Sequence, residues 1–171
     1  MFNIEPIKLL SGSHKDTAQT GQGCFMNVIA YLNGESQITD KSSCVCITIR
    51  PIAIFLNDFA NDAQRQKLLP FVLRAMGTAT DDKVIISKRI EAVVKFAEFN
   101  ARLAESAAEP TKSAAEYAKY AEIKARHKAI SEEIFNAGLE FLEMVCNPAQ
   151  EYNQTIINRA NDLMKLNSVM A

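Results

Sequence analysis

Apolar residues recur at three- and four-residue spacing along most of this chain, the pattern of helices that pack one face against a core. The first such segment begins at Gly23, and Gly34 stands where a glycine commonly ends a helix. Its apolar positions are Phe25, Met26, Val28, Ile29 and Leu32. We therefore expect a helix here, with Cys24 in its first turn.

The segment from Cys44 to Phe59 allows two interpretations. Its first half is β-branched enough for a strand. We favour a helix that starts near Pro51, because no second strand is evident to pair with this one. Asp40 stands where a helix cap ahead of Cys44 would lie. The expected apolar face of the helix consists of Ile52, Phe55, Leu56 and Phe59.

The next helical pattern begins at Asn61 and Asp62, two residues that commonly cap helices, and ends at Gly77. Pro70 lies inside the pattern. A proline in a helix removes one backbone hydrogen bond and clashes with the preceding turn. The sequence therefore predicts a kink or a break at Leu69.

Three longer helices are expected in the second half: one from Asp81 or Asp82 to about Glu105, one over residues 113–146 and one over about 150–167. The first carries a continuous apolar stripe formed by Ile86, Ile90, Val93, Val94 and Ala97. The second would be roughly 50 Å long at 1.5 Å per residue, which exceeds one small core. Either Gly138 marks a bend in that helix, or the helix projects and meets another subunit.

These patterns predict an all-α fold: a compact helical domain of about six helices with a long C-terminal helical hairpin. A chain of 171 residues is long enough for one hydrophobic core. Residues 1–80 would form an N-terminal helical region that carries the site. Residues 81–171 would form a helical bundle or hairpin, either as part of the same domain or as an oligomerisation element, and we expect a homo-oligomer.

The composition argues against two classes of partner. The net charge is −1 and the pI is about 6.1, so there is no overall field to attract nucleic acid or an anionic membrane. The first six residues do not resemble a secretory signal, and no apolar run is long enough to span a bilayer. We expect a cytoplasmic protein, whose cysteines stay reduced.

Residue types that core packing does not require are concentrated between residues 10 and 58. This stretch contains three of the four cysteines, one of the two histidines and four of the six glycines. A polar, glycine-containing loop that leads into a helix amino terminus can present amides to a phosphate or carboxylate. The candidate ligand-binding residues are Ser11, Gly12, Ser13, His14, Gly23, Cys24, Asn27, Asp40, Arg50, Asn57 and Asp58.

The same residues allow two catalytic alternatives. Cys24 at a helix amino terminus can act as a nucleophile with His14 as its base, because the helix dipole and an imidazole both favour a thiolate. Alternatively, His14, Cys24, Cys44 and Cys46 form an acceptable set of four ligands for zinc, with Asp40 as a substitute for one of them. Against both stands the ordinary use of cysteine as a small buried apolar residue.

Part of this pattern resembles a family of small uncharacterised proteins from actinobacteria and bacteriophages. The resemblance covers roughly residues 9–80 and includes the Gly-Ser-His run, Gly23-Cys24, Gly34-Glu35, Asp40, Cys44 and Asn57-Asp58. Members often carry an acid at the position of Asn27 and a proline at that of Ser42. The family has no established activity, so the resemblance implies where a site lies and not what the site does.

Taken together, the sequence favours a small cytoplasmic protein, phage-encoded if the resemblance holds and then located in the host cytoplasm. It would bind a phosphate- or nucleotide-type ligand or a host signalling metabolite through the region of His14 and Cys24. One alternative is a cysteine- or zinc-dependent hydrolase that uses these two residues. The other is a helical interaction module that inhibits a host protein, with the helix over 113–146 as its surface.

Overall fold

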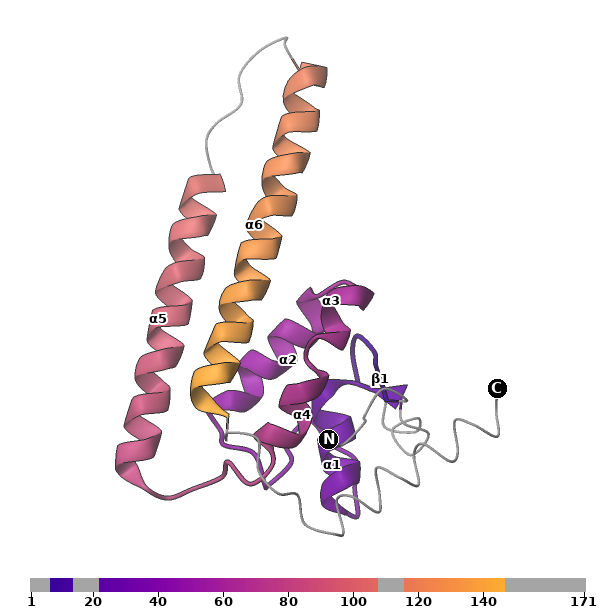
Figure 1. Cartoon of the computed structure of the whole chain (residues 1–171), viewed down its shortest axis with the longest axis vertical. Coiled ribbons are helices and arrows are strands. Elements are labelled where there is room, and N and C mark those ends of the chain that lie inside the picture. The colour runs from indigo at the N-terminus through magenta and orange to yellow at the C-terminus, as the bar shows by residue number, and fades with distance from the viewer. Residues whose placement is uncertain (1–6, 14–21, 108–115, 147–171) are drawn as a thin grey trace.

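The structure, a computed structural model, describes residues 7–13, 22–107 and 116–146 (Figure 1). This part of the chain is mostly helical, which confirms the all-α expectation, and it also contains two very short strands. The elements are β1 (Lys8–Leu9), β2 (Gln22–Gly23), α1 (Phe25–Asn33), α2 (Ile49–Phe59), α3 (Asp62–Gln66), α4 (Leu69–Ala75), α5 (Lys83–Ala107) and α6 (Glu116–Val145). The helix expected over 150–167 lies outside the described residues.

The centre of the core is α1, which packs against α2, α4 and β2. Its five predicted apolar side chains are fully buried. The helix ends as expected, because Gly34 has a φ of 77°, in the left-handed region, and its amide bonds the carbonyls of Ala30 and Tyr31. Cys24 is the N-cap residue, one position before the first helical residue.

The two strands pair in parallel, with Lys8 opposite Gln22 and Leu9 opposite Gly23. Such a short ladder has little stability of its own. The side chain of Gln66 in α3 supports it, because its Oε1 accepts from the Leu9 amide at 3.1 Å and its Nε2 donates to the Leu9 carbonyl at 3.0 Å. The strands therefore depend on α3 for their position.

The preference for a helix in the Cys44 to Phe59 segment is confirmed, and residues 44–48 form turns. The predicted face of α2 is partly wrong. Ile49, Ala53 and Leu56 are fully buried, whereas Phe55 and Phe59 are 41% and 38% exposed and stack on each other at 5.3 Å between ring centroids. The reason is that α2 turns its Ile49–Ala53–Leu56 side toward α1 and α6.

The break near Leu69 is confirmed. Asn61 and Gln64 form a capping box at the start of α3, in which each side chain accepts from the backbone amide of the other. The α-helix ends at Gln66 and a new one begins at Leu69, with Lys67 and Leu68 in a turn between them, so that Pro70 lies in the first turn of α4. In a first turn a proline costs no helical hydrogen bond.

The start of α5 is also as predicted, because Asp82 Oδ1 accepts from the amides of Val84 and Ile85. Its apolar stripe, however, is largely exposed. The residues of α5 that are buried are Arg89, Ala92 and Phe96, on a different side of the helix from Ile90 and Val94.

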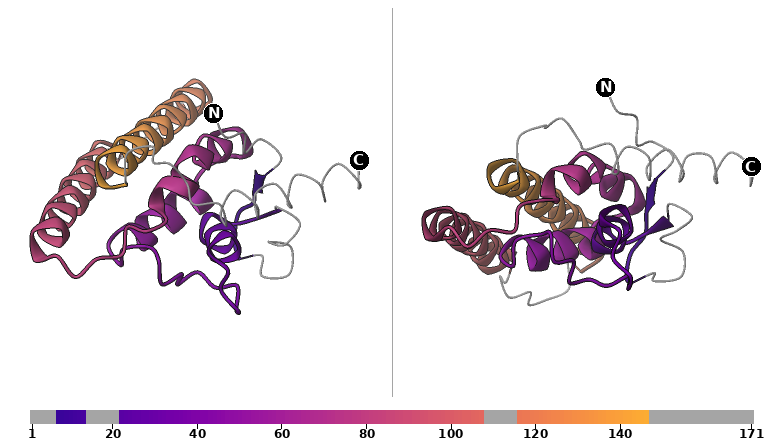
Figure 2. Two further views of the ribbon diagram at one scale, coloured as in Figure 1. Left: turned by 60° about the horizontal axis from the view of Figure 1, so that its bottom comes forward. Right: turned by 90° about the horizontal axis from the view of Figure 1, so that it is seen from below.

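Helices α5 and α6 pack side by side as an antiparallel pair, called the hairpin below, on the opposite side of the molecule from the strands (Figures 1 and 2). Phe96 and Phe141 contact each other across the pair, with 5.7 Å between ring centroids. At its lower end, the buried Arg89 donates from Nε to the Val145 carbonyl at 3.2 Å and from Nη1 to the Thr78 carbonyl at 2.5 Å. Arg89 thereby ties α5 to the end of α6 and to the preceding turn.

Helix α6 continues through Gly138 to Val145 as one helix. At Gly138, α6 lies directly against Leu56 of α2. A Cβ atom added at Gly138 would lie 2.2 Å from Leu56 Cδ2 and 2.7 Å from Leu56 Cδ1. The absence of a side chain therefore sets the approach of the hairpin to the core.

We expect Gly138→Ala to destabilise the protein by about 1 to 3 kcal/mol, the usual cost of overpacking. The sign of the change in unfolding free energy is informative, because replacing glycine by alanine within a helix otherwise stabilises a protein by about 1 kcal/mol. Urea unfolding measures the change. In a Leu56→Ala background the same substitution should cost much less, and a stabilising Gly138→Ala in the unaltered chain would contradict the close contact.

Candidate functional site

The start of α1 is organised by the side chain of Cys24. Its Sγ accepts from the Asn27 amide at 3.4 Å, and its carbonyl accepts from the Val28 amide at 3.1 Å. The same sulfur donates to Asp40 Oδ1 at 3.4 Å, and Asn27 Nδ2 donates to that oxygen at 2.9 Å. The sequence predicted that Asp40 caps a helix ahead of Cys44, and this prediction is wrong, because α2 begins only at Ile49. Asp40 holds the loop after α1 against the first turn of α1.

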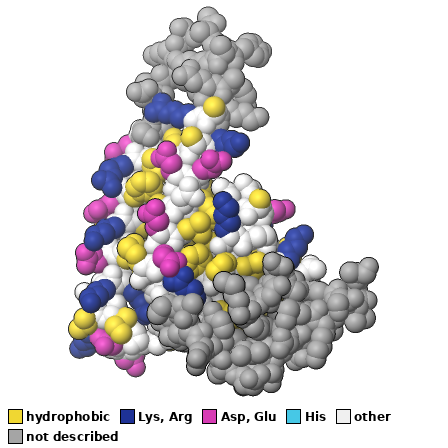
Figure 3. Space-filling model, in the orientation of Figure 1, with side chains coloured by type: hydrophobic (Ala, Val, Ile, Leu, Met, Phe, Trp, Pro, Cys, Tyr) yellow, Lys and Arg dark blue, Asp and Glu magenta, His cyan; other side chains and the backbone are white. Residues whose placement is uncertain are grey.

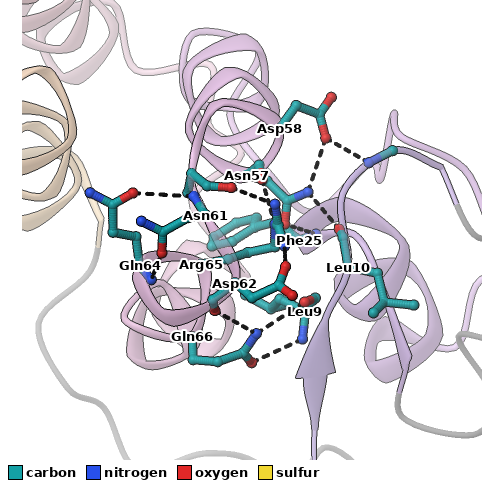
Figure 4. A network of polar contacts seen from close by, with 12 residues as sticks. Leu9, Leu10, Phe25, Asn57, Asp58, Asn61, Asp62, Gln64, Arg65 and Gln66 are labelled. Atoms are coloured by element: carbon teal, nitrogen blue, oxygen red, sulfur yellow. Dashed lines mark hydrogen bonds and ion pairs between the residues drawn. The ribbon is translucent and has the colours of Figure 1, made fainter. Parts of the chain in front are cut away.

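Asn57 joins three segments beside this turn (Figure 4). Its Oδ1 accepts from the Phe25 amide at 3.2 Å, and its Nδ2 donates to the Leu10 carbonyl at 2.8 Å. The neighbouring Asp58 accepts from the Gly12 amide at 2.7 Å and from Asn57 Nδ2 at 3.1 Å. The end of α2 thus supplies hydrogen-bond partners both to the first turn of α1 and to the chain segment that follows β1.

Arg65 holds Asn57 from the other side (Figure 4). This buried guanidinium donates from Nε to the Asn57 carbonyl at 2.7 Å and from Nη2 to the Ala60 carbonyl, and it forms an ion pair of 2.6 Å with Asp62. The carbonyls at a helix carboxyl end lack helical partners and carry partial negative charge. Sequence reasoning gave Arg65 no such role, although the capping box just before it fixes its position.

Most of the predicted ligand-binding residues do come together around the start of α1. These are Gly12, Gly23, Cys24, Asn27, Asp40, Asn57 and Asp58. Arg50 lies apart from them and donates to the Val45 carbonyl at 2.8 Å. Ser11 and Ser13 are exposed, and His14 lies outside the described residues.

The amides at the start of α1 already have partners within the protein. Asn57 takes the Phe25 amide, and the Cys24 sulfur takes those of Met26 and Asn27. An anion bound by a helix amino terminus needs such amides free. The carboxylate of Asp40 adds negative charge at the same place. The described residues therefore connect segments of the fold, and the ligand hypothesis depends on His14 and the residues after it.

The environment of Cys24 keeps its thiol protonated. Burial is the main cause, and the neighbouring Asp40 carboxylate adds to it, so the Cys24 pKa rises from 9.0 to about 12 in spite of the hydrogen bonds from the α1 amides. A thiol nucleophile acts as the thiolate, which a raised pKa disfavours. The geometry around Cys24 thus fits a capping residue better than the nucleophile of a hydrolase.

The three cysteines of the proposed zinc set have separate surroundings. Cys24 contacts Asp40, whereas Cys44 lies 3.2 Å from Ser42 Oγ and Cys46 lies 3.2 Å from Thr48 Oγ1. In the described part of the chain, no three His, Cys, Asp or Glu side chains are close enough together to hold a metal ion. The structure therefore does not assemble Cys24, Cys44 and Cys46 into one metal centre.

Cys46 is the described cysteine whose pKa falls. Burial raises the pKa of this thiol, but hydrogen bonds from Thr48 and the nearby Arg89 guanidinium lower it by more, so that the net shift is downward. The Cys46 side chain is nonetheless almost fully buried. Arg89 is a second residue that sequence reasoning missed, because nothing in the sequence distinguishes this buried arginine from the exposed charged residues of the same helix.

Replacement of Asn57 by alanine should lower the free energy of unfolding by about 2 to 4 kcal/mol, because it leaves the Phe25 amide and the Leu10 carbonyl without partners. Urea unfolding of the full chain measures this. Asn33→Ala is a matched control, because the exposed Asn33 bonds only the Glu35 side chain at 3.1 Å and should change stability by less than about 0.5 kcal/mol. Equal effects of the two substitutions would contradict the role given to Asn57.

The raised pKa of Cys24 predicts a loss of stability in alkali. The folded state holds the Cys24 proton up to a pH of about 12, whereas the unfolded chain releases it near 9.0, so the stabilising contribution is complete below pH 9 and declines between those values. Cys24→Ser keeps a side chain that caps helices and removes this ionisation. Urea unfolding between pH 8 and alkaline pH should therefore show a shallower decline for Cys24→Ser than for the unaltered chain, and parallel declines would refute the assignment.

No family profile, curated protein or solved structure matches this chain. The resemblance to actinobacterial and phage proteins accordingly stays a prediction.

Proposed function

We propose that this protein is a helical interaction protein, which binds a helix of another protein along the outer face of α5. The observation that carries the proposal is an apolar stripe that the fold leaves uncovered. Ile90, Val94 and Ala97 of the predicted apolar stripe are exposed, because α5 packs on α6 through other residues.

The exposed stripe, called the stripe below, consists of Ile90, Val94, Ala97 and Ala101, spaced by four, three and four residues. It leaves out the half-buried Ile86 and Val93 of the predicted stripe. This alternation is the one found along the seam of two packed helices. Ile90 and Val94 are each 48% exposed, and both alanines are exposed. Small side chains at the upper end allow a partner helix to approach closely. The stripe therefore has both the spacing and the exposure of an unfilled helix contact.

The charges beside the stripe favour a basic partner helix. Glu91, Glu98 and Glu105 follow one another at intervals of seven residues and are all exposed. At flanking positions of paired helices, opposite charges select the partner. Lys95 pairs with Glu91 at 2.9 Å, but both side chains are well exposed and such a pair contributes little. A helix with Lys or Arg beside its own apolar stripe would complement this surface.

The acidic row also argues for a protein partner over a membrane surface. Amphipathic helices that lie on anionic membranes carry basic residues beside their apolar face. Across the described helices, none has the length and apolar content needed to cross a bilayer. Figure 3 shows hydrophobic side chains interspersed with charged ones of both signs over the hairpin.

The sequence suggested the helix over 113–146 as an interaction surface, whereas the surface proposed here lies on α5. The exposed residues of α6 between Ala125 and Glu143 are mainly charged or polar. The small-ligand and hydrolase hypotheses stay predictions that depend on His14.

A photo-crosslinking residue at position 94 should join the protein to a partner segment that is helical and carries Lys or Arg beside an apolar stripe. Binding of the purified partner should weaken at least about tenfold in the double variant Ile90→Glu, Val94→Glu, because each substitution places a carboxylate against the apolar stripe of the partner, where its charge is desolvated. A matched control is Lys41→Glu with Lys67→Glu, two exposed positions outside the hairpin. Unchanged binding by the stripe variant, or crosslinks at random surface sites, would overturn the proposal.

A further inference from the structure

A groove runs along the hairpin between α5 and α6, and none of the four stripe residues lines it. Its volume is about 600 Å³. Its floor is apolar and is formed by the buried Phe96 and Phe141 and the half-buried Phe99, and Met144 beside them is 66% exposed. The groove is thus a second, separate surface of the hairpin that can receive side chains from a partner.

The two rims of the groove carry opposite charges. The α5 rim has Lys95 and Arg102, and the α6 rim has Glu133 and Glu140. Among the described residues, Arg102, Glu133 and Glu140 have no ion-pair partner, and Lys95 pairs only with Glu91 of its own helix. A partner that fits this groove must therefore present acid to one rim and base to the other.

The opposite charges lie at matching heights along the hairpin. The contact between Phe96 and Phe141 fixes the level of the two antiparallel helices. Because α5 runs upward and α6 downward, Lys95 lies one residue below that level and Glu140 one residue above it. Arg102 lies six residues above the level and Glu133 eight residues above it. At 1.5 Å per residue, each basic residue is within about 3 Å of the height of its acidic counterpart on the other rim.

We propose that the occupant of the groove is the same groove of a second copy of this chain. A two-fold axis parallel to the hairpin exchanges its two sides and preserves height. It therefore places Lys95 opposite Glu140 of the second copy and Arg102 opposite its Glu133, and the reciprocal pairs form by symmetry. The two hairpins together make a four-helix bundle, with the aromatic floors facing each other.

The rim charges also select this arrangement over its alternative. A two-fold axis perpendicular to the hairpin would stack α5 on α5 and α6 on α6, which opposes bases to bases and acids to acids. Like charges in contact are destabilising, and opposite charges set register and orientation. The parallel axis is thus the one that the four charges favour.

Charge exchange tests the dimer in the full chain. Light scattering with size-exclusion chromatography should give the mass of a dimer for the unaltered protein at high micromolar concentration. Two variants, one with Lys95→Glu and Arg102→Glu and the other with Glu133→Lys and Glu140→Lys, should each weaken the dimer by about tenfold or more. An equimolar mixture of the two variants should form a heterodimer, because every cross pair is then of opposite sign.

The variant with all four substitutions controls for folding and net charge, and it should dimerise like the unaltered chain. Circular dichroism of each variant checks that the helices persist. A monomer at all concentrations, or charge variants that dimerise like the unaltered chain, would overturn the inference. A dimer that is lost through Ile90→Glu and Val94→Glu and kept by the rim variants would overturn it as well, since the stripe would then be the contact. Partner binding at the stripe is measured separately, so each proposal can fail alone.

Discussion

The fold depends on the hydrogen bonds that Asn57 makes at the carboxyl end of α2. One side chain supplies an acceptor to the first amide of α1 and a donor to the chain after β1, while Arg65 fixes its backbone from behind. Both groups are buried, where an unpaired polar atom is costly. The interaction therefore specifies one relative placement of the strands, α1 and α2, which general apolar packing would leave loosely defined. Asp58 and Asp40 add to this placement, because they bond the Gly12 amide and the side chains of Cys24 and Asn27.

The hairpin is attached to this unit by a different kind of contact. Gly138 lets α6 lie directly on Leu56, and Arg89 binds the carbonyls at the end of α6 and in the turn before α5. Both contacts are in the lower part of the hairpin. The upper part of the hairpin is therefore supported by contacts between its own two helices, which leaves much of its surface uncovered and open to other chains.

Helical spacing and end residues predicted most of the elements. Gly34 ended α1, Asp82 started α5 and Pro70 marked the break before α4, because each acts through its own backbone geometry. The buried faces of α2 and α5 were not predicted well. Phe55 and Ile90 are apolar and regularly spaced, but which side of a helix is covered depends on neighbours far away in sequence. The candidate site was located through its residue types, and the sequence could not reveal that Cys24 and Asn57 satisfy the very amides a ligand would need.

The position of Gly138 has a consequence for how this protein can change over evolution. Among the described residues of α6, the buried side chain farthest from the base of the hairpin is Phe135, one turn above that glycine, so the parts of the two helices beyond it are free to lengthen or shorten together. Insertions or deletions of seven residues in each helix would keep the same sides facing each other. Related chains can thus acquire arms of different reach on an unchanged base, and gain or lose surface without any adjustment around Leu56.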